Sequence, residues 1–222
     1  MAGRLVVFEG VEGAGKSTQL AALAARLGRA GVPCRTWREP GGTPAGDRIR
    51  AMLLDPAVTM DARTEALLFM ASRAELLARD VQPALAAGTV VLLDRYFLST
   101  YAYQVAGRGL PEAEIVAANR AATAGLVPDL TILVAVPAAV GLARAAARGA
   151  TDRMERSGDD FHARVEAAFA TFATDAWQAA HPEAGPVAVV DGVGTAREVE
   201  RRVAAAVGAR FPDLASRLER VA

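Results

Sequence analysis

Apolar runs of strand length recur along this chain, and amphipathic stretches separate them. The runs are rich in Val, Leu and Ile, and turn or charged residues bound each of them, as is typical of buried strands in a parallel sheet. Leu20, Leu23 and Leu27 have the helical spacing of an apolar face that covers such a sheet. We therefore predict an α/β fold with a five-stranded parallel sheet and helices on both faces. The predicted strands are Leu5–Phe8, Cys34–Arg38, Val90–Leu93, Leu130–Val136 and Val187–Val190.

Turn and capping residues set the expected helix boundaries. Asp61 and Thr195 precede amphipathic stretches as N-caps, and Pro111 opens a helix that runs to about Ala124. No repeat or linker divides the chain, so we expect one domain over residues 1–222. The polar segment 149–160 is expected to form a short lid. The other predicted helices are Gly15–Arg29, Ala45–Leu54, one from Ala138, one that follows the lid and runs to about Ala180, and one from Pro212.

The stretch Gly10–Ser17 follows the first strand and reads Gly-Val-Glu-Gly-Ala-Gly-Lys-Ser. Its glycines allow a tight turn that brings backbone N–H groups close to a polyphosphate, and the following helix adds the positive end of its dipole. Lys16 is the only lysine of the chain, and a forked guanidinium cannot replace its compact ammonium in such a loop. A chance match to this pattern would rarely have a predicted strand directly before the loop and a predicted helix directly after it. The chain is therefore expected to bind a nucleotide through a P-loop.

Oxygen ligands for magnesium are expected beside this loop. The third predicted strand ends in Asp94, the Walker-B arrangement, in which a carboxylate holds Mg²⁺ directly or through water. The Ser17 hydroxyl is the other expected ligand. Glu9 is expected close to these two ligands without binding the metal directly.

Several arginines and one aromatic residue are further candidates. Arg38 and Arg95 each follow an apolar strand, where α/β folds place ligands. Phe69 and Arg73 are four residues apart on one helix face and could stack on a base and bond to its edge, although a core phenylalanine beside a surface arginine has the same spacing. The polar stretch after the fourth strand contributes Arg148, Arg153 and Arg156.

The amino-acid composition argues against several classes of protein. The 25 basic and 25 acidic residues balance, which argues against a nucleic-acid coat protein or a polybasic membrane binder. Cys34 is the only cysteine, so no intramolecular disulfide can form. The first strand begins within a few residues of the start, and no apolar run has transmembrane length. A cytoplasmic location is the simplest expectation.

Taken together, these stretches resemble a bacterial thymidylate kinase along nearly the whole chain. One block would be weak evidence, but all of them in order are specific. The resemblance implies a P-loop NTPase-type fold, Mg²⁺ as cofactor, and transfer of the γ-phosphate of ATP to dTMP, which gives dTDP for dTTP synthesis. The matching stretches are Glu9–Thr18, Arg38–Thr43, Asp94–Tyr96, Ser99–Thr100, Ala102–Gln104, Gly107–Gly109, Pro128–Thr131, Arg148–Gly149 and Asp152–Arg153.

The resemblance also implies roles for single residues. Arg38 would hold the acceptor phosphate and Glu12 the deoxyribose, and the catalytic residues would be Lys16, Asp94, Arg95 and Arg153. The implied ATP site is Gly10, Val11, Glu12, Gly13, Ala14, Gly15, Lys16, Ser17, Thr18 and Arg148. The implied dTMP site is Glu12, Arg38, Pro40, Arg48, Phe69, Arg73, Arg95, Ser99, Thr100, Tyr103 and Gln104.

Two features bear on the type of enzyme. The P-loop carries no arginine, so the resemblance implies a bacterial type whose lid supplies one, and Arg153 is favoured over Arg148 and Arg156. Ala135 stands where the family often has a carboxylate, which puts any role of that strand end in doubt. The resemblance also implies a homodimer, for which Leu67, Leu68 and Met70 and the pair Ile115 and Val116 offer apolar surface.

Rival interpretations stay open at this point. Another small kinase could act on a different nucleotide or on a nucleoside, although Arg38 favours an acceptor that already carries a phosphate. A guanine-dependent switch needs an Asn-Lys-x-Asp motif, which a chain with its single lysine in the P-loop cannot have. A non-catalytic nucleotide-binding module is the third possibility, and the intact set Lys16, Ser17 and Asp94 weighs against it.

Overall fold

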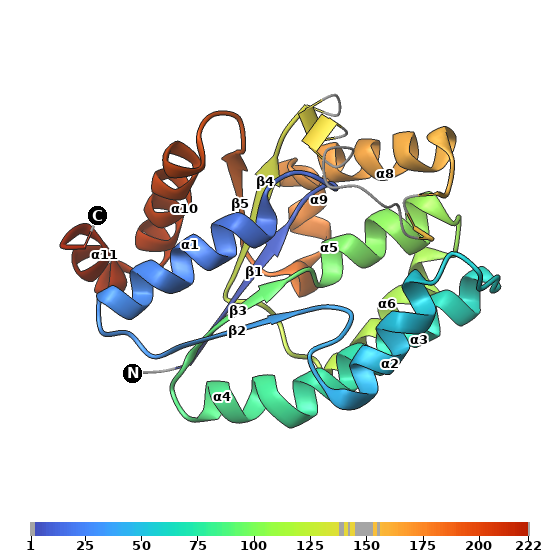
Figure 1. Ribbon diagram of the computed structural model, residues 1–222, viewed down its shortest axis with the longest axis horizontal. Coiled ribbons are helices and arrows are strands. Elements are labelled where there is room, and N and C mark those ends of the chain that lie inside the picture. The colour runs from blue at the N-terminus through green and yellow to red at the C-terminus, as the bar shows by residue number, and fades with distance from the viewer. Residues whose placement is uncertain (1–2, 138–139, 142, 145–152, 155, 222) are drawn as a thin grey trace.

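The computed structural model describes residues 3–137, 140–141, 143–144, 153–154 and 156–221. Five strands form one sheet in the order β2-β3-β1-β4-β5, and every neighbouring pair is parallel (Figure 1). The predicted five-stranded parallel sheet is thus confirmed. The strands are β1 Arg4–Glu9, β2 Cys34–Arg38, β3 Val90–Asp94, β4 Leu130–Ala135 and β5 Val187–Asp191.

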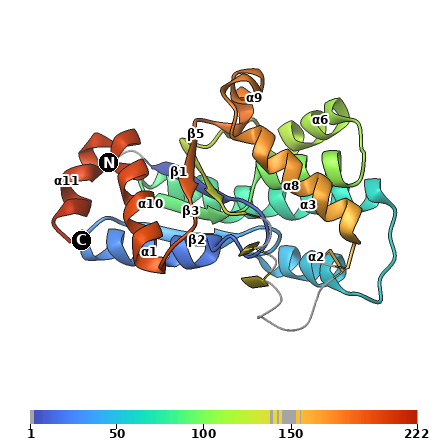
Figure 2. The same ribbon diagram turned by 90° about the horizontal axis from the view of Figure 1, so that it is seen from above.

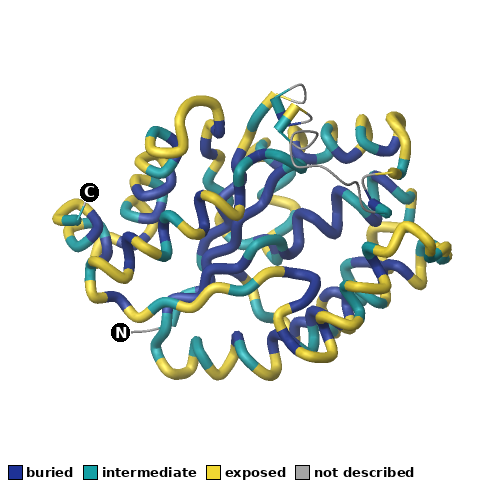
Figure 3. Tube along the Cα trace, viewed as in Figure 1, coloured by how far each residue is buried: buried dark blue, intermediate teal, exposed yellow. Residues whose placement is uncertain are grey.

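Helices lie on both faces of the sheet because successive side chains of β1 point to opposite sides. Leu5 and Val7 belong to one core cluster, with η1, α5, η2 and α8, whereas Val6 and Phe8 belong to the other, with α1, α10 and α11. The two layers are seen in Figure 2, and the buried strands between them in Figure 3. The helical segments are α1 Lys16–Arg29, α2 Pro44–Leu54, α3 Ala62–Leu76, η1 Leu77–Val81, α4 Gln82–Ala86, α5 Phe97–Thr100, η2 Tyr101–Gly107, α6 Glu112–Thr123, α8 Asp159–Phe172, α9 Asp175–Ala180, η3 Pro182–Ala184, α10 Ala196–Arg210 and α11 Pro212–Glu219.

The predicted helix caps are present in the structure. Asp61 Oδ1 accepts a hydrogen bond from the Arg63 amide at 2.8 Å, and Thr195 forms a capping box with Glu198 at the start of α10. These local bonds satisfy backbone N–H groups that a helix start leaves without partners.

One predicted helix is wrong in its extent. The stretch expected to continue to Ala180 is two helices, because α8 ends at Phe172 and the Thr174 side chain caps α9 by accepting from the Trp177 amide. The helix expected from Ala138 and much of the lid near 149–160 lie outside the described residues. Across the part of the chain that the structure describes, no helix is long and apolar enough to cross a membrane.

The register of the strands brings the candidate residues to one edge of the sheet. Asp94 at the end of β3 is aligned with Phe8 on one side and with Arg38 on the other. The P-loop and the turn after Asp94 therefore leave the sheet side by side, at the carboxyl ends of β1 and β3.

Candidate active site

The P-loop wraps around its own lysine. The Lys16 ammonium donates to the carbonyl oxygens of Gly10, at 3.0 Å, and Val11, at 2.8 Å. Gly13 has a φ of 71°, and a Cβ there would lie 2.0 Å from the Gly141 carbonyl oxygen, so this position requires glycine. Burial, helped by the nearby charge of Arg95, lowers the pKa of Lys16 to about 7.

The two expected magnesium ligands meet at the first turn of α1. The Ser17 hydroxyl donates to Asp94 Oδ2 at 2.5 Å. One hydroxyl and one carboxylate oxygen beside a phosphate loop are the donors that Mg²⁺ uses in such sites, with waters and phosphate oxygens as its other ligands. The pair therefore fits the cation that the sequence predicts.

Glu9 has a different set of partners. Its carboxylate is buried and accepts from the amides of Tyr96, at 2.7 Å, and Ser99, at 3.1 Å, and from the Ser99 hydroxyl at 2.6 Å. These bonds hold the start of α5 and the turn in which Arg95 has a φ of 73°. The structure thus makes Glu9 the anchor of that turn, and its role behind the magnesium stays a prediction.

A polar cavity lies in front of the P-loop, with about 730 Å³ of empty space. Lys16 and three arginines supply its positive charge, and Arg38, which is exposed, comes from the end of β2. This collection of cations suits more than one phosphate group. The lining residues are Glu12, Gly13, Gly15, Lys16, Ser17, Thr18, Arg38, Glu39, Arg50, Asp94 and Arg95.

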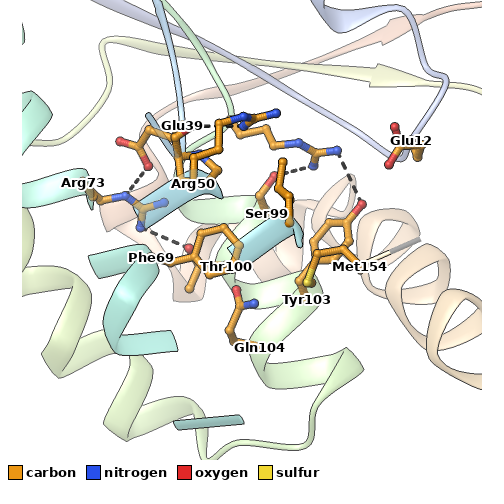
Figure 4. A pocket seen from close by; sticks show the side chains of 13 residues that line it. Glu12, Glu39, Arg50, Phe69, Arg73, Ser99, Thr100, Tyr103, Gln104 and Met154 are labelled. Atoms are coloured by element: carbon orange, nitrogen blue, oxygen red, sulfur yellow. Dashed lines mark hydrogen bonds and ion pairs between the residues drawn. The ribbon is translucent and has the colours of Figure 1, made fainter. Parts of the chain in front are cut away.

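A second, more apolar cavity of about 660 Å³ adjoins the first (Figure 4). The two cavities share Glu12, Glu39, Arg50 and Arg95, so one ligand can extend from one into the other. The residues that line only the second are Pro40, Leu54, Phe69, Arg73, Ser99, Thr100, Tyr103, Gln104 and Met154.

Arg95 lies at the junction of the two cavities. Its Nη1 donates to the Ser99 hydroxyl at 2.8 Å, and its guanidinium carbon is 5.2 Å from the centre of the Tyr103 ring. Burial disfavours the charged form of Arg95, but Tyr103 and the carboxylates of Glu9, Asp94 and Glu12 outweigh it and raise the pKa of Arg95, so Arg95 stays charged.

Arg73 lies in the wall of the second cavity and is only 2% exposed. Its Nε donates to Glu39 at 2.6 Å, its Nη1 to Thr100 at 3.1 Å and to Asn119, and its Nη2 to the Tyr96 carbonyl at 3.0 Å. Burial raises the pKa of Glu39 to about 7, and the charge of Arg73 opposes that rise.

The buried carboxylate of Glu65 forms a polar cluster behind the same cavity. Arg108 donates to it at 3.0 and 3.1 Å, Gln104 donates at 3.1 Å, and Arg153 forms an ion pair at 2.7 Å. Sequence reasoning missed Glu65, although Glu65, Phe69 and Arg73 follow at intervals of four and so share one face of α3.

The chain was compared with known proteins. A family model described as thymidylate kinase matches residues 8–185. This chain belongs to the thymidylate kinase family. A thymidylate kinase of Deinococcus radiodurans is 45% identical over 208 residues, which cover 94% of this chain and 98% of that protein. Relatives of the same name from Pseudomonas fluorescens, strain Pf-5, and Thermomicrobium roseum are 51% and 48% identical over 76% and 89% of this chain, and over 81% and 96% of their own lengths. Family membership confirms the resemblance seen in the sequence.

Several arginines of this thymidylate kinase family member do not lie where the sequence predicted them. Arg48 is exposed on α2 and lines neither cavity, whereas Arg50, two residues later, lines both and donates to the Pro40 carbonyl at 3.0 Å. Arg153 also lines neither cavity, because it points to Glu65. Arg148 lies outside the described residues, and Arg156 is exposed.

Burial changes the expected dimer surface. Met70 and Ile115, which were expected to offer dimer surface, are 5% and 4% exposed and pack inside this chain, whereas Leu67 is 62% exposed. Ala135 is exposed at the end of β4, where its carbonyl accepts from the Gly192 amide at 2.7 Å.

Proposed function

We propose that this chain transfers the γ-phosphate of magnesium-bound ATP to dTMP, forming dTDP and ADP for dTTP synthesis. The joined cavities carry the proposal. One is lined by the P-loop, Lys16 and arginines, and the other by an aromatic ring, an amide and a buried guanidinium. Such a pair fits two phosphate-bearing groups and a flat polar base, and membership of the thymidylate kinase family supports dTMP as the acceptor.

On the donor side, the P-loop amides and Lys16 bind the β- and γ-phosphates. The bonds that Lys16 now makes to the Gly10 and Val11 carbonyls already hold its ammonium over the loop. Ser17 and Asp94 would hold Mg²⁺, which neutralises charge on the phosphate being transferred. A third cavity shares Gly15 and Thr18 with the first, polar cavity and is lined by Arg144 and Gly192, and the nucleoside of ATP would lie there.

On the acceptor side, Arg50 and Arg95 line both cavities where they join, and Arg38 lines the first cavity. Donor and acceptor phosphates repel each other, so fixed cations between them lower the cost of bringing them together and stabilise charge in the transition state. Arg95 is held in place by Ser99 and Tyr103, so it needs little rearrangement to meet the acceptor phosphate.

The base would lie against Phe69, with its edge toward Arg73 and Gln104. Phe69 is half-buried and lines the cavity with its ring (Figure 4). Arg73 donates to the O4 atom of thymine, and the amide oxygen of Gln104 accepts from N3–H. Glu12 lies where the deoxyribose would join base and phosphate, because it lines both cavities.

A homodimer and a cytoplasmic location stay predictions. The exposed Leu67 and the half-buried Leu68 and Val116 are the apolar residues of the expected surface that remain available for a dimer. A concentration series in analytical ultracentrifugation, with Leu67→Glu as the variant, tests the dimer.

The test of the reaction is phosphorus NMR of Mg-ATP mixed with dTMP, AMP, CMP, GMP or thymidine in separate samples. We expect ADP and dTDP to appear with dTMP and no turnover with thymidine, because the acceptor must bring a phosphate for Arg38, Arg50 and Arg95. Faster turnover of AMP, CMP or GMP than of dTMP would contradict the proposed acceptor.

A further inference from the structure

Glu65 is a buried carboxylate with four donor contacts from three other side chains. It is 1% exposed and lies on α3, one turn before Phe69. Burial alone would raise the pKa of Glu65, but the hydrogen bonds and charge of Arg108, with further bonds from Arg153 and Gln104, lower it. Glu65 is therefore ionised and can only accept hydrogen bonds.

This property fixes the orientation of Gln104. Because a carboxylate only accepts, the Gln104 amide must turn its Nε2 toward Glu65, which it does at 3.1 Å. Its Oε1 then lies at the other end of the amide, on the side of Phe69 in the cavity (Figure 4). An oxygen at that place accepts from the N3–H of thymine or uracil, whereas the N3 of cytosine has no proton to give.

The same carboxylate holds the described residues of the expected lid, which include Arg153 and Ser157. The Arg153 Nη1 pairs with Glu65, while its Nε and its backbone amide donate to the carbonyls of Leu53, at 2.7 Å, and Leu54, at 3.1 Å, at the end of α2. Arg108 extends the cluster, since its Nη2 donates to the Ser157 hydroxyl at 3.1 Å. Arg153 and Ser157 are thereby joined to the polar cluster of Glu65 behind the second cavity.

We propose that Glu65 is a positioning residue that both orients the amide of Gln104 toward the base and ties the lid, through Arg153, to the acceptor site. The part that concerns the base rests on the proposed function, because dTMP is the ligand that Gln104 would read. The part that concerns the lid rests on contacts within the chain alone.

The first test is Glu65→Gln, which keeps the size of the side chain but lets either end of its amide face Gln104. We expect the preference for dTMP over dCMP, measured both as the ratio of kcat/KM values and as the ratio of Kd values in calorimetry, to fall about tenfold, equivalent to about 1.4 kcal/mol. The loss should appear mainly in the KM of dTMP, and the KM of Mg-ATP should stay within about twofold of wild type.

A matched control is available on the same helix. The half-buried Glu75 of α3 is paired with the exposed Arg79 at 3.2 Å and lines neither cavity, so Glu75→Gln removes one charge away from both. We expect it to leave both preferences at the wild-type value. A Glu65→Gln protein that keeps the wild-type preference for dTMP would overturn the role of Glu65 in orienting Gln104.

The second variant tests the lid and does not depend on turnover. Arg153→Met keeps much of the side-chain length but cannot pair with Glu65, while Arg108 and Gln104 can still reach it. We expect hydrogen exchange of the backbone amides at 153, 154, 156 and 157 to quicken about tenfold, as local opening becomes easier, with the dTMP preference retained. Unchanged exchange would overturn the tie between Glu65 and the lid.

The two failures can be told apart. A wild-type protein that does not phosphorylate dTMP would overturn the proposed function and the base-reading part, yet the exchange experiment would still decide the lid. A wild-type protein that prefers dTMP, combined with an unchanged Glu65→Gln variant and unchanged exchange in Arg153→Met, would overturn this inference alone.

Discussion

The polar cavity in front of the P-loop is the phosphate cavity, and the more apolar cavity lined by Phe69, Arg73 and Gln104 is the base cavity. The two adjoin each other but are built in different ways. Lys16 bonds to Gly10 and Val11, which lie six and five positions away in the chain. In the base cavity, Arg73 bonds to Glu39 and Asn119, at separations of 34 and 46 positions, and Glu65 bonds to Arg108 at 43. The P-loop part of the first cavity is therefore local backbone geometry, to which Asp94 is added from 77 positions away through Ser17. The second cavity exists only when α3, η2 and Arg153 have packed together.

The largest expected effect is on the local site. Lys16→Met removes the ammonium that the P-loop holds toward the phosphates, and we expect kcat to fall about a thousandfold. The base cavity has no contact with Lys16, so the Kd of dTMP should stay within about twofold of wild type. Steady-state kinetics and calorimetry measure the two values. A comparable loss of dTMP affinity would show that Lys16 also contributes to the binding of dTMP.

The next largest effect is expected in the base cavity. Arg73→Ala removes the donor to the base edge and leaves Glu39 buried without its partner, so we expect dTMP affinity to fall about a hundredfold and the free energy of unfolding to fall by about 3–5 kcal/mol. Affinity for an ATP analogue should stay near wild type.

The double variant Arg73→Ala with Glu39→Gln separates these two effects. It removes the stranded charge, so stability should return in part while dTMP affinity stays low. If affinity returns with stability, Arg73 supports the fold and does not read the base.

This contrast explains what could be predicted from the sequence. The five strands, the P-loop, Asp94 and the caps at Asp61 and Thr195 follow from local patterns, and the structure agrees with them. The contacts of Glu65, Arg108 and Arg153 depend on which distant segments pack together, and local sequence patterns do not encode that packing. The i, i+4 spacing of Glu65, Phe69 and Arg73 was the one available clue.

The paired arginines of α2 illustrate the same limit on a smaller scale. The sequence prediction put Arg48 in the acceptor site, but α2 turns Arg50 toward the cavities and leaves Arg48 exposed. Residues two positions apart lie on different faces of a helix. A helix predicted from the sequence alone does not show which of these faces meets the cavities, so it cannot distinguish Arg48 from Arg50.

Comparison of Arg50→Ala with Arg48→Ala tests this placement. Arg50 lies where the acceptor phosphate would bind, so its loss should raise the KM of dTMP about tenfold, the scale of one charge-assisted hydrogen bond. Arg48→Ala is the matched control and should change that KM by less than about twofold. Equal effects of the two variants would contradict the assignment.

The smallest effect is a dependence of ATP binding on pH. The pKa of Lys16 is lowered to about 7 in this structure, and a polyphosphate favours the protonated ammonium, so binding above pH 7 must take up a proton. We expect the Kd of Mg-ATP to rise about fivefold between pH 7 and pH 8. Calorimetry at pH 8 in buffers of different ionisation enthalpy measures the uptake, and Lys16→Met should abolish it. No uptake by the wild type would contradict the lowered pKa.

A crystal structure with dTMP and ADP bound together is the measurement to make. We expect the thymine ring against Phe69, its N3 within hydrogen-bonding distance of Gln104 Oε1, its O4 beside Arg73, and its phosphate among Arg38, Arg50 and Arg95. ADP should lie on the P-loop, with its base beside Arg144. A thymine ring outside the cavity formed by Phe69, Arg73 and Gln104 would contradict the division of the site into a local phosphate cavity and an assembled base cavity.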